Sequence, residues 1–195
     1  MRKFLILIFT FQFGFSQVGG ESVFEFLNLQ TSPRINSLGG YGANVIGGDP
    51  NLGLYNPALI NSKMNSSLVL NYTNYHADIN YGSFLFASNF KKLKNPILFS
   101  LTYLDYGSFE ETNEFGEILG DFSASDYLFS LSTSKRIYTI DSLSFFNLGL
   151  SFKSAYSQLY YENSFSILSD ISLLFHNKKR RITSSLLIRN LGYHL

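Results

Sequence analysis

The side chains that could carry out acid–base or nucleophilic chemistry in this chain are few and scattered. It contains three histidines, His76, His176 and His194, and no cysteine. His76 lies in "NYHADINYG" and His176 in "FHNKKRR", and both segments are typical of turns between strands. A serine nucleophile needs a base and an orienting group converging in space. Serines are plentiful and Asp78 lies two residues after His76, but no motif indicates such a site. The sequence therefore predicts no catalytic residue and a protein that is not an enzyme.

Segment 108–124, "SFEETNEFGEILGDFSA", is the second candidate site, because it holds carboxylates and no basic residue. The carboxylates are those of Glu110, Glu111, Glu114, Glu117 and Asp121. The best match to a calcium-binding loop begins at Glu111 and fails at its fifth and twelfth positions, Phe115 and Phe122, which supply no side-chain oxygen. Neither a phosphate-binding glycine loop nor a Cys/His metal spacing occurs, so no cofactor and no metal are expected. The segment is interpreted as a solvated surface loop, a partner contact or an ion site.

The elements that would position these residues are strands, because apolar and polar residues alternate from Ser67 onward. In "FFNLGLSFKSAY", for example, Phe146, Leu148 and Leu150 share one face and Asn147, Gly149 and Ser151 the other, which is the period of a strand. The predicted strands lie near 67–76, 81–90, 97–107, 125–135, 145–156, 164–175 and 181–190. Segment 35–46 could add an eighth.

The strands are longer than those of most soluble sheets, and their polar face is made of small neutral residues. Strands of about 9–11 residues suit a tilted membrane crossing, whereas about 5–6 is usual in soluble domains. The chain has 20 Phe and 13 Tyr but no Trp, and the tyrosines cluster towards strand ends, as an aromatic girdle does. The predicted fold is all-β, an antiparallel transmembrane β-barrel of the outer membrane. A secreted β-sandwich is the alternative.

The first 16 residues are typical of a secretory signal peptide. Arg2 and Lys3 precede a short apolar run, and Gly14 and Ser16 are small residues at a cleavage site after Ser16. Without Arg2 and Lys3, 13 of the 15 basic residues remain against 14 acidic residues. This balance argues against nucleic acid as a partner.

Residues 17–64 are too irregular for a barrel strand. Their "GGDPNLGLYNPALI" stretch, residues 47–60, combines glycine, proline and asparagine with apolar side chains. Backbone without regular pairing is tolerated at membrane depth only where it is buried in protein or lines a cavity. Residues 17–64 are therefore predicted to fold into the lumen as a plug, with a periplasmic lead-in loop as the alternative, and residues 65–195 to form barrel strands. The motif residues of the plug are Gly39, Gly40, Asp49, Pro50, Asn56, Pro57 and Ala58.

The sequence resembles the FadL/PorV-type outer-membrane barrels, in which a glycine-rich run and an Asn-Pro-Ala turn precede the first regular strands. More specifically, it is similar to the PorQ family of the type IX secretion system. Five stretches in order carry that resemblance: "GGESVFEFLNLQTSPRINSLGG", "LNYTNYHADINYGSFLFA", "LTYLDYGSFEETNEFGEILGDFSASDY", "YENSFSILSDI" and "SLLIRNLGY".

The resemblance implies a non-enzymatic protein of the outer membrane that holds a PorZ-like surface protein. Its further partners would be the other members of the attachment complex, a sortase and a PorV-like barrel, together with outer-membrane lipid. The alternative function is a FadL-like transporter of hydrophobic small molecules. Members of the family carry further strands after the "RNLGY" region, so this chain is expected to be an amino-terminal portion with about seven or eight strands of a larger barrel.

Overall fold

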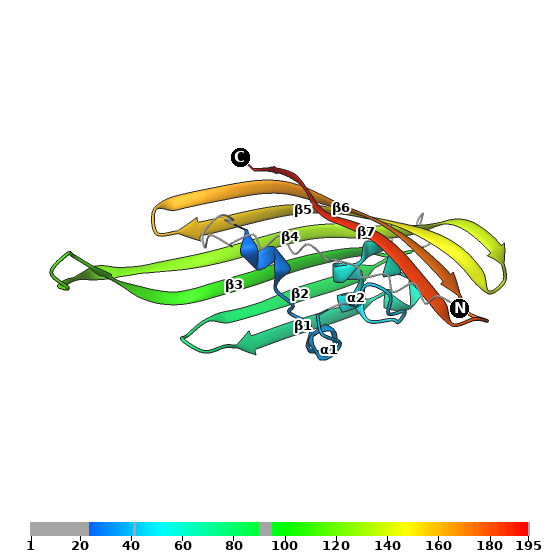
Figure 1. The fold of residues 1–195 in the computed structure, drawn as a ribbon, viewed down its shortest axis with the longest axis horizontal. Helices are drawn as coiled ribbons and strands as arrows, with labels where there is room; N and C mark the ends of the chain where they lie inside the picture. The colour runs from blue at the N-terminus through cyan, green and yellow to red at the C-terminus, as the bar shows by residue number, and fades with distance from the viewer. Residues whose placement is uncertain (1–23, 41, 90–94, 195) are drawn as a thin grey trace, which may run out of the picture.

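The computed structural model describes residues 24–40, 42–89 and 95–194. Its main element is one antiparallel sheet in which each strand pairs with the next along the chain (Figure 1). The strands are β1 (Ser67–Asn74), β2 (Asn80–Ser88), β3 (Ile97–Thr112), β4 (Ile118–Asp141), β5 (Ser144–Leu159), β6 (Glu162–Asn177) and β7 (Ile182–His194). The prediction of an all-β, antiparallel fold is confirmed. The predicted signal peptide, residues 1–16, lies outside the described residues.

Short helical turns make up about half of the described chain before the sheet. They are η1 (Glu25–Asn28), α1 (Pro33–Ser37), α2 (Pro50–Tyr55), η2 (Pro57–Leu59) and η3 (Ser62–Met64). The eighth strand suggested for 35–46 is wrong for the described residues of that segment. The Ser32 side chain accepts the Ile35 N–H at 3.4 Å and Pro33 occupies the first helical position, and these are helix-start signals.

The two faces of the sheet have opposite chemistry. We call the face covered by the helical turns the inner face and the opposite one the outer face. Buried polar side chains of the inner face are Ser83, Ser100, Thr102, Asp126, Ser130, Ser132, Ser134, Asn147, Ser151, Lys153, Ser166, Asp170 and Ser172. Exposed apolar side chains of the outer face include Leu68, Leu70, Phe86, Phe129, Leu131, Leu150, Phe152, Ile167, Ile171, Leu173, Leu186 and Ile188. The period-two alternation of each strand produces this separation.

Apolar side chains join the helical turns to the inner face in two clusters. The larger one contains Ile35, Leu52, Tyr55, Ala58, Leu59, Ile60, Met64, Leu85, Ala87, Leu98 and Leu174. The smaller one contains Phe26, Leu104, Leu128, Ala155 and Leu168. Each cluster combines residues from before the sheet with residues of the strands, so the described part of 17–64 and the sheet share their cores.

Strands β3 and β4 extend past their neighbours and form the long hairpin at the left of Figure 1. The sequence predicted a loop over 108–124, and this prediction is wrong in its extent, because β3 continues to Thr112 and β4 begins at Ile118. Phe109 and Phe122 are paired in register, and their rings stack with centroids 5.2 Å apart. Such a cross-strand aromatic pair favours continued pairing, which the acidic composition of the segment concealed.

Candidate functional site

The Asn-Pro-Ala motif folds into a capped turn that is buried against the sheet. Asn56 caps η2, since its side-chain Oδ1 accepts the Ala58 N–H at 3.0 Å, and Pro57 takes the first helical position. The Asn56 amide also donates to the Ala43 carbonyl at 2.7 Å. Asn56 is fully buried, so its amide links two stretches of the segment inside the protein.

Polar groups of the inner face bind the backbone of this turn. The Ala58 N–H donates to Ser172 Oγ at 2.9 Å, and the Ala58 carbonyl accepts from the Asn147 side-chain amide at 3.3 Å. Ser134 Oγ donates to the Ile60 carbonyl at 2.5 Å. Because buried backbone groups require partners, the hydroxyls and amide of β4, β5 and β6 form a docking site for residues 56–60.

Gly149 makes room for this turn on β5. A Cβ added at Gly149 would lie 2.6 Å from Ala58 Cα and would also collide with the Pro57 carbonyl carbon and the Ala58 nitrogen. A glycine inside a strand often marks such a close approach of another backbone. The sequence showed that Gly149 lies on the polar face of its strand, but it carried no signal for which segment would approach.

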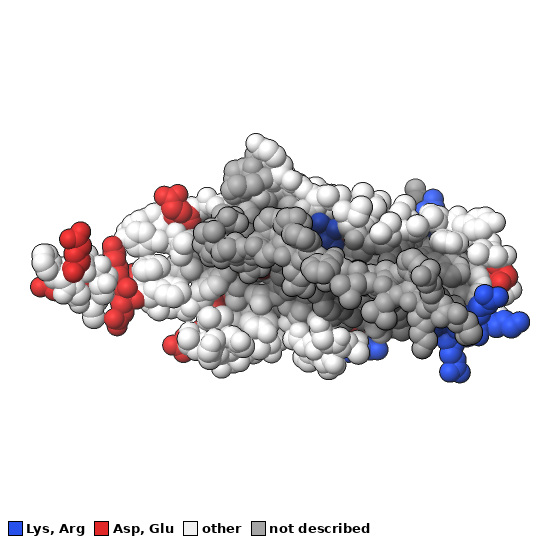
Figure 2. Space-filling view, in the orientation of Figure 1, with Lys and Arg blue, Asp and Glu red and all other residues white. Residues whose placement is uncertain are grey.

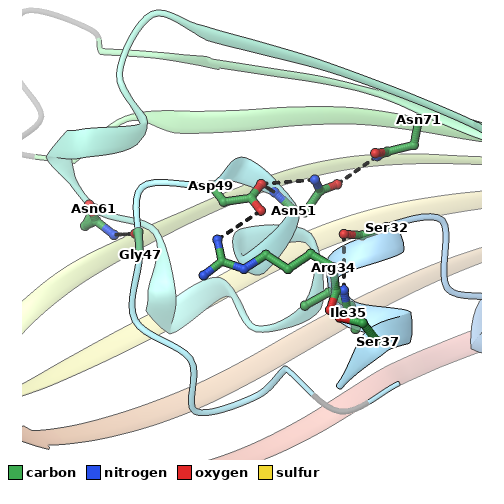
Figure 3. Close-up of polar contacts among 9 residues, drawn as sticks. All are labelled: Ser32, Arg34, Ile35, Ser37, Gly47, Asp49, Asn51, Asn61 and Asn71. Atoms are coloured by element: carbon green, nitrogen blue, oxygen red, sulfur yellow. Dashed lines mark hydrogen bonds and ion pairs between the residues drawn. The ribbon is translucent and has the colours of Figure 1, made fainter. Parts of the chain in front are cut away.

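The Asp-Pro motif starts helix α2 in the same way. Asp49 caps the helix by accepting the Asn51 N–H at 3.0 Å, with Pro50 at the first position. Arg34 reaches the Asp49 carboxylate at 3.4 Å, and the Asn51 side chain accepts from Asn71 on β1 at 2.8 Å (Figure 3). The motif therefore connects α1, α2 and β1.

Gly39 and Gly40 end helix α1. Both have positive φ, +77° and +82°, which glycine adopts without the steric cost that a Cβ would bring. The Gly40 N–H donates to the Ile35 carbonyl at 3.0 Å, and the Gly40 carbonyl accepts from the Tyr55 hydroxyl. The structure thus brings all seven predicted motif residues into the helical segment on the inner face.

A buried ion pair lies on the inner face of β5 and β6. Lys153 Nζ is 2.6 Å from the Asp170 carboxylate, and the side chains are 2% and 0% exposed. Asn190 of β7 completes the network, because its N–H donates to Asp170 Oδ1 at 2.8 Å and its Oδ1 accepts from Lys153 at 3.1 Å. Asn190 has positive φ and lies at the register shift between β6 and β7. The network therefore stabilises the β-bulge between β6 and β7.

The contact between the helical segment and the sheet leaves little free volume. A cavity of about 30 Å³ lies between η1, α1, α2 and the inner face, with Tyr55, Lys153 and Arg189 in its lining. The Arg189 guanidinium lies 4.9 Å from the centre of the Tyr55 ring. This volume has room for about two waters and is too small for an organic substrate.

The five predicted carboxylates all lie on the β3–β4 hairpin, where Glu110 and Asp121 are cross-strand register partners. Glu110 and Glu111 are on β3 and Asp121 is on β4, while Glu114 and Glu117 belong to the turn between the strands. Within the described residues, no group of three or more His, Cys, Asp or Glu side chains could hold a metal ion.

The tip of this hairpin is an ordered turn with an exposed aromatic ring. Asn113 Oδ1 accepts the N–H groups of Phe115 and Glu117, both at 2.9 Å, and its amide donates to Glu117 at 2.7 Å. The Phe115 side chain is 89% exposed. The β5–β6 turn contacts the hairpin, because the Tyr160 hydroxyl donates to the Glu111 carboxylate at 3.0 Å. The pKa of the Tyr160 hydroxyl is raised, most by its hydrogen bond with Tyr161 and next by the one with Glu111.

No family model matches this chain, and no curated protein or solved structure matches it. The resemblance to the PorQ family accordingly rests on the sequence stretches alone, and it remains a prediction. The geometry of the inner and outer faces of the sheet and of the β3–β4 hairpin supports a function independently of that resemblance.

Aromatic residues form two rows on the outer face. In the first, cross-strand partners follow one another from β1 to β6: Tyr72, Gly82, Tyr103, Tyr127, Tyr156 and Phe165. The second contains Tyr138, Phe146 and Phe175. Among the described outward-facing residues between these rows, Lys135 is the only charged one, and it lies near the second row, where a long basic side chain can reach polar surroundings.

Charged side chains gather at the two ends of the strands. Carboxylates lie at the end that carries the β3–β4 hairpin, and basic side chains lie at the other, where residues 178–181, "KKRR", connect β6 to β7 (Figure 2). At the basic end, Asp141 accepts the Leu143 N–H at 2.7 Å, and this hydrogen bond holds the pKa of the carboxyl below its usual value.

The structure places the three histidines in different elements. His76 lies in the turn between β1 and β2, as predicted, with its ring edge-on to Tyr75. His176 is not in a turn but in β6, where its Nδ1 lies 3.0 Å from Thr183 Oγ1. His194 is the last residue of β7. In the part of the chain that the structure describes, no helix is long and apolar enough to cross a membrane.

Proposed function

We propose that this sheet is part of the wall of an outer-membrane β-barrel that anchors a surface protein, and that it serves the type IX secretion system. The observation that supports it most is the inversion of the sheet, with buried serines and an ion pair inside and exposed Leu, Ile and Phe outside. Exposed apolar patches larger than a few hundred Å² are rare on soluble monomers. In the strands of a membrane barrel, apolar side chains likewise point outward to lipid and polar side chains point inward.

The spacing of the two aromatic rows suits a bilayer. Their members are ten residues apart on β5, at Tyr156 and Phe146, and ten apart on β6, at Phe165 and Phe175. Ten residues rise about 33 Å along a strand, or about 25 Å across a membrane at a tilt of about 40°. That is the height expected for the apolar band of an outer-membrane barrel.

The filled inner face supports an anchoring role over transport. The helical segment binds the sheet through buried hydrogen bonds to Ala58 and Ile60, and the cavity beside it is about 30 Å³. A FadL-like transporter of hydrophobic molecules is the alternative. It would require this segment to leave the inner face during passage.

The β3–β4 hairpin is the part we assign to partner binding. Barrels place long connections on the outer side and short turns on the periplasmic side, so the hairpin would project from the cell and the 142–143 turn would face the periplasm. Phe115 and the surrounding carboxylates would then meet a surface partner of PorZ type.

Cysteine labelling tests the membrane topology directly, because the chain has no cysteine of its own. Phe115→Cys and Leu143→Cys place single thiols in turns at opposite ends of the sheet. We expect a membrane-impermeant maleimide to label position 115 on intact cells that lack the surface partner, and position 143 only after the outer membrane is permeabilised. Labelling of both positions, or of neither, on intact cells would contradict this topology.

A clean gene deletion tests the anchoring role. We expect the PorZ-like protein to leave the cell surface, and cargo with a carboxy-terminal sorting domain to stall or be attached wrongly. If the surface exposure of the PorZ-like protein and the attachment of cargo are unchanged while uptake of a labelled fatty acid falls, the transporter hypothesis is correct.

A further inference from the structure

The first aromatic row is interrupted once, and the interruption opens a groove on the outer face. Gly82 of β2 stands in register between Tyr72 of β1 and Tyr103 of β3. The groove at this position has a volume of about 230 Å³. Elsewhere the row is closed by neighbouring rings, for example Tyr103 and Tyr127 with centroids 5.0 Å apart.

The backbone requires the gap in the row. A Cβ added at Gly82 would collide with the Asn71 carbonyl oxygen of β1, so a side chain could enter only if the paired strands moved. Its lining residues are Leu70, Asn71, Tyr72, Asn80, Tyr81, Gly82, Ser83, Phe84, Leu101 and Tyr103. The groove is therefore a consequence of the pairing of β1, β2 and β3, which places a glycine between two tyrosines.

The lining changes from polar to apolar along the strands. On one side of the row, Asn80 accepts a hydrogen bond from the Tyr72 hydroxyl at 2.8 Å. On the other side, Leu70 and Phe84 are register partners, and Leu101 pairs with Phe84. No lining residue carries a charge. The groove therefore suits an uncharged occupant with a hydrocarbon part beside Leu70 and a neutral polar end near Asn80.

We propose that this groove binds one acyl chain of a membrane phospholipid. The chain would lie between the Tyr72 and Tyr103 rings and along Leu70, Phe84 and Leu101, with the uncharged ester region at Asn80. The inference rests on the proposed function, because it assumes that the outer face contacts lipid. A chain inside the groove contacts protein on more sides than one lying on the closed part of the row, and the added dispersion contacts favour it.

Tryptophan quenching measures this preference, because the chain has no tryptophan. Phe84→Trp places the reporter in the groove. Phe129→Trp is the matched control, because Leu101 pairs with both Phe84 and Phe129 while Phe129 is not in the lining. The full chain is reconstituted in dioleoyl phosphatidylcholine vesicles with increasing fractions of dibrominated phosphatidylcholine. Phe84→Trp should reach half-maximal quenching at a brominated fraction about fivefold lower than Phe129→Trp, because the more polarisable brominated chain gains more dispersion contacts inside the groove. An equal or higher fraction for Phe84→Trp would contradict the groove proposal.

Groove-filling variants separate a site from a local property of the reporter. Leu70→Phe in the Phe84→Trp background should abolish the difference from Phe129→Trp, whereas Leu68→Phe, on the same strand but outside the lining, should leave it. Identical curves for Phe84→Trp and Phe129→Trp would overturn the groove proposal and leave the proposed function standing. Absence of quenching at both positions would overturn both.

Discussion

Ala58 of the helical segment lies directly on Gly149 of β5, so close that a Cβ at Gly149 would fall 2.6 Å from Ala58 Cα. The Ala58 N–H donates to Ser172 of the neighbouring strand β6. The turn at residues 57–59 is therefore held by the backbone of one strand and the side chain of the next. Mutations on the sheet should consequently change how the segment is bound.

Gly149→Ala should displace the segment. The added methyl group would meet backbone atoms of Pro57 and Ala58, which cannot rotate away, so the cost should lie towards the upper end of the about 1–3 kcal/mol usual for overpacking. Limited proteolysis in detergent should cut the segment faster. Gly120→Ala on β4 is the control, because a Cβ there meets nothing within 4 Å; equal protease resistance of the two variants would contradict the contact.

Asn56 and Ser172 share one donor, the Ala58 N–H, and should show coupled effects. Ser172→Ala should cost about 1 kcal/mol, because Asn56 still accepts the N–H. Asn56→Ala should cost more, about 2 kcal/mol, because it removes the cap of η2 and also one of the two donors to the Ala43 carbonyl, the other being the Ser185 hydroxyl. A double-mutant cycle by denaturant unfolding measures the coupling. Strict additivity would show that the two acceptors act independently, and Ser154→Ala on the outer face serves as the control.

The strands could be predicted because alternation is a local property of the sequence. That Asn147 and Ser151 share one face of β5 and Leu148 and Leu150 the other follows from spacing alone. The caps at Asp49 and Asn56 were also readable, since a residue with a side-chain acceptor before proline is a local helix-start signal.

Long-range contacts were not readable in the same way. Asn190 contacts Lys153 and Asp170 only because a bulge shifts β7 relative to β6. No residue type in "LIRNLGY" predicts that shift. The hairpin was misread because acidic residues and glycines suggest a loop. Its pairing depends on Phe109 meeting Phe122 across the ladder.

Breaking the buried ion pair should cost more than removing it. Lys153→Met leaves the Asp170 carboxylate buried without its cation, which costs about 3–5 kcal/mol. Adding Asp170→Asn removes the charge while keeping an oxygen that can accept from the Asn190 N–H. The double variant should therefore regain most of the lost stability. Unfolding in denaturant checks this, and a double variant as unstable as Lys153→Met would contradict it.

The turn at Asp141 should respond to acid. Its hydrogen bond from the Leu143 N–H lowers the pKa of the carboxyl below the usual 3.8. With the folded pKa below the unfolded one, the contribution to stability is present above pH about 3.8 and is lost as pH falls through the lower folded value. The Leu143 amide resonance should titrate with a midpoint below 3.8 and should not titrate in Asp141→Asn. A midpoint at or above the usual value would contradict the hydrogen bond.

Phe115→Ser should weaken capture of the surface partner without changing stability. Its side chain is 89% exposed, so the substitution should change the free energy of unfolding by less than about 0.5 kcal/mol. An exposed aromatic side chain that becomes buried in a partner commonly contributes about 2 kcal/mol to binding, and we expect at least about a tenfold loss. Leu143→Ser, in a turn at the opposite end of the sheet, is the matched control. Co-purification of the surface partner from cells carrying each variant is the measurement, and equal recovery with Phe115→Ser and Leu143→Ser would contradict a contact between Phe115 and the partner.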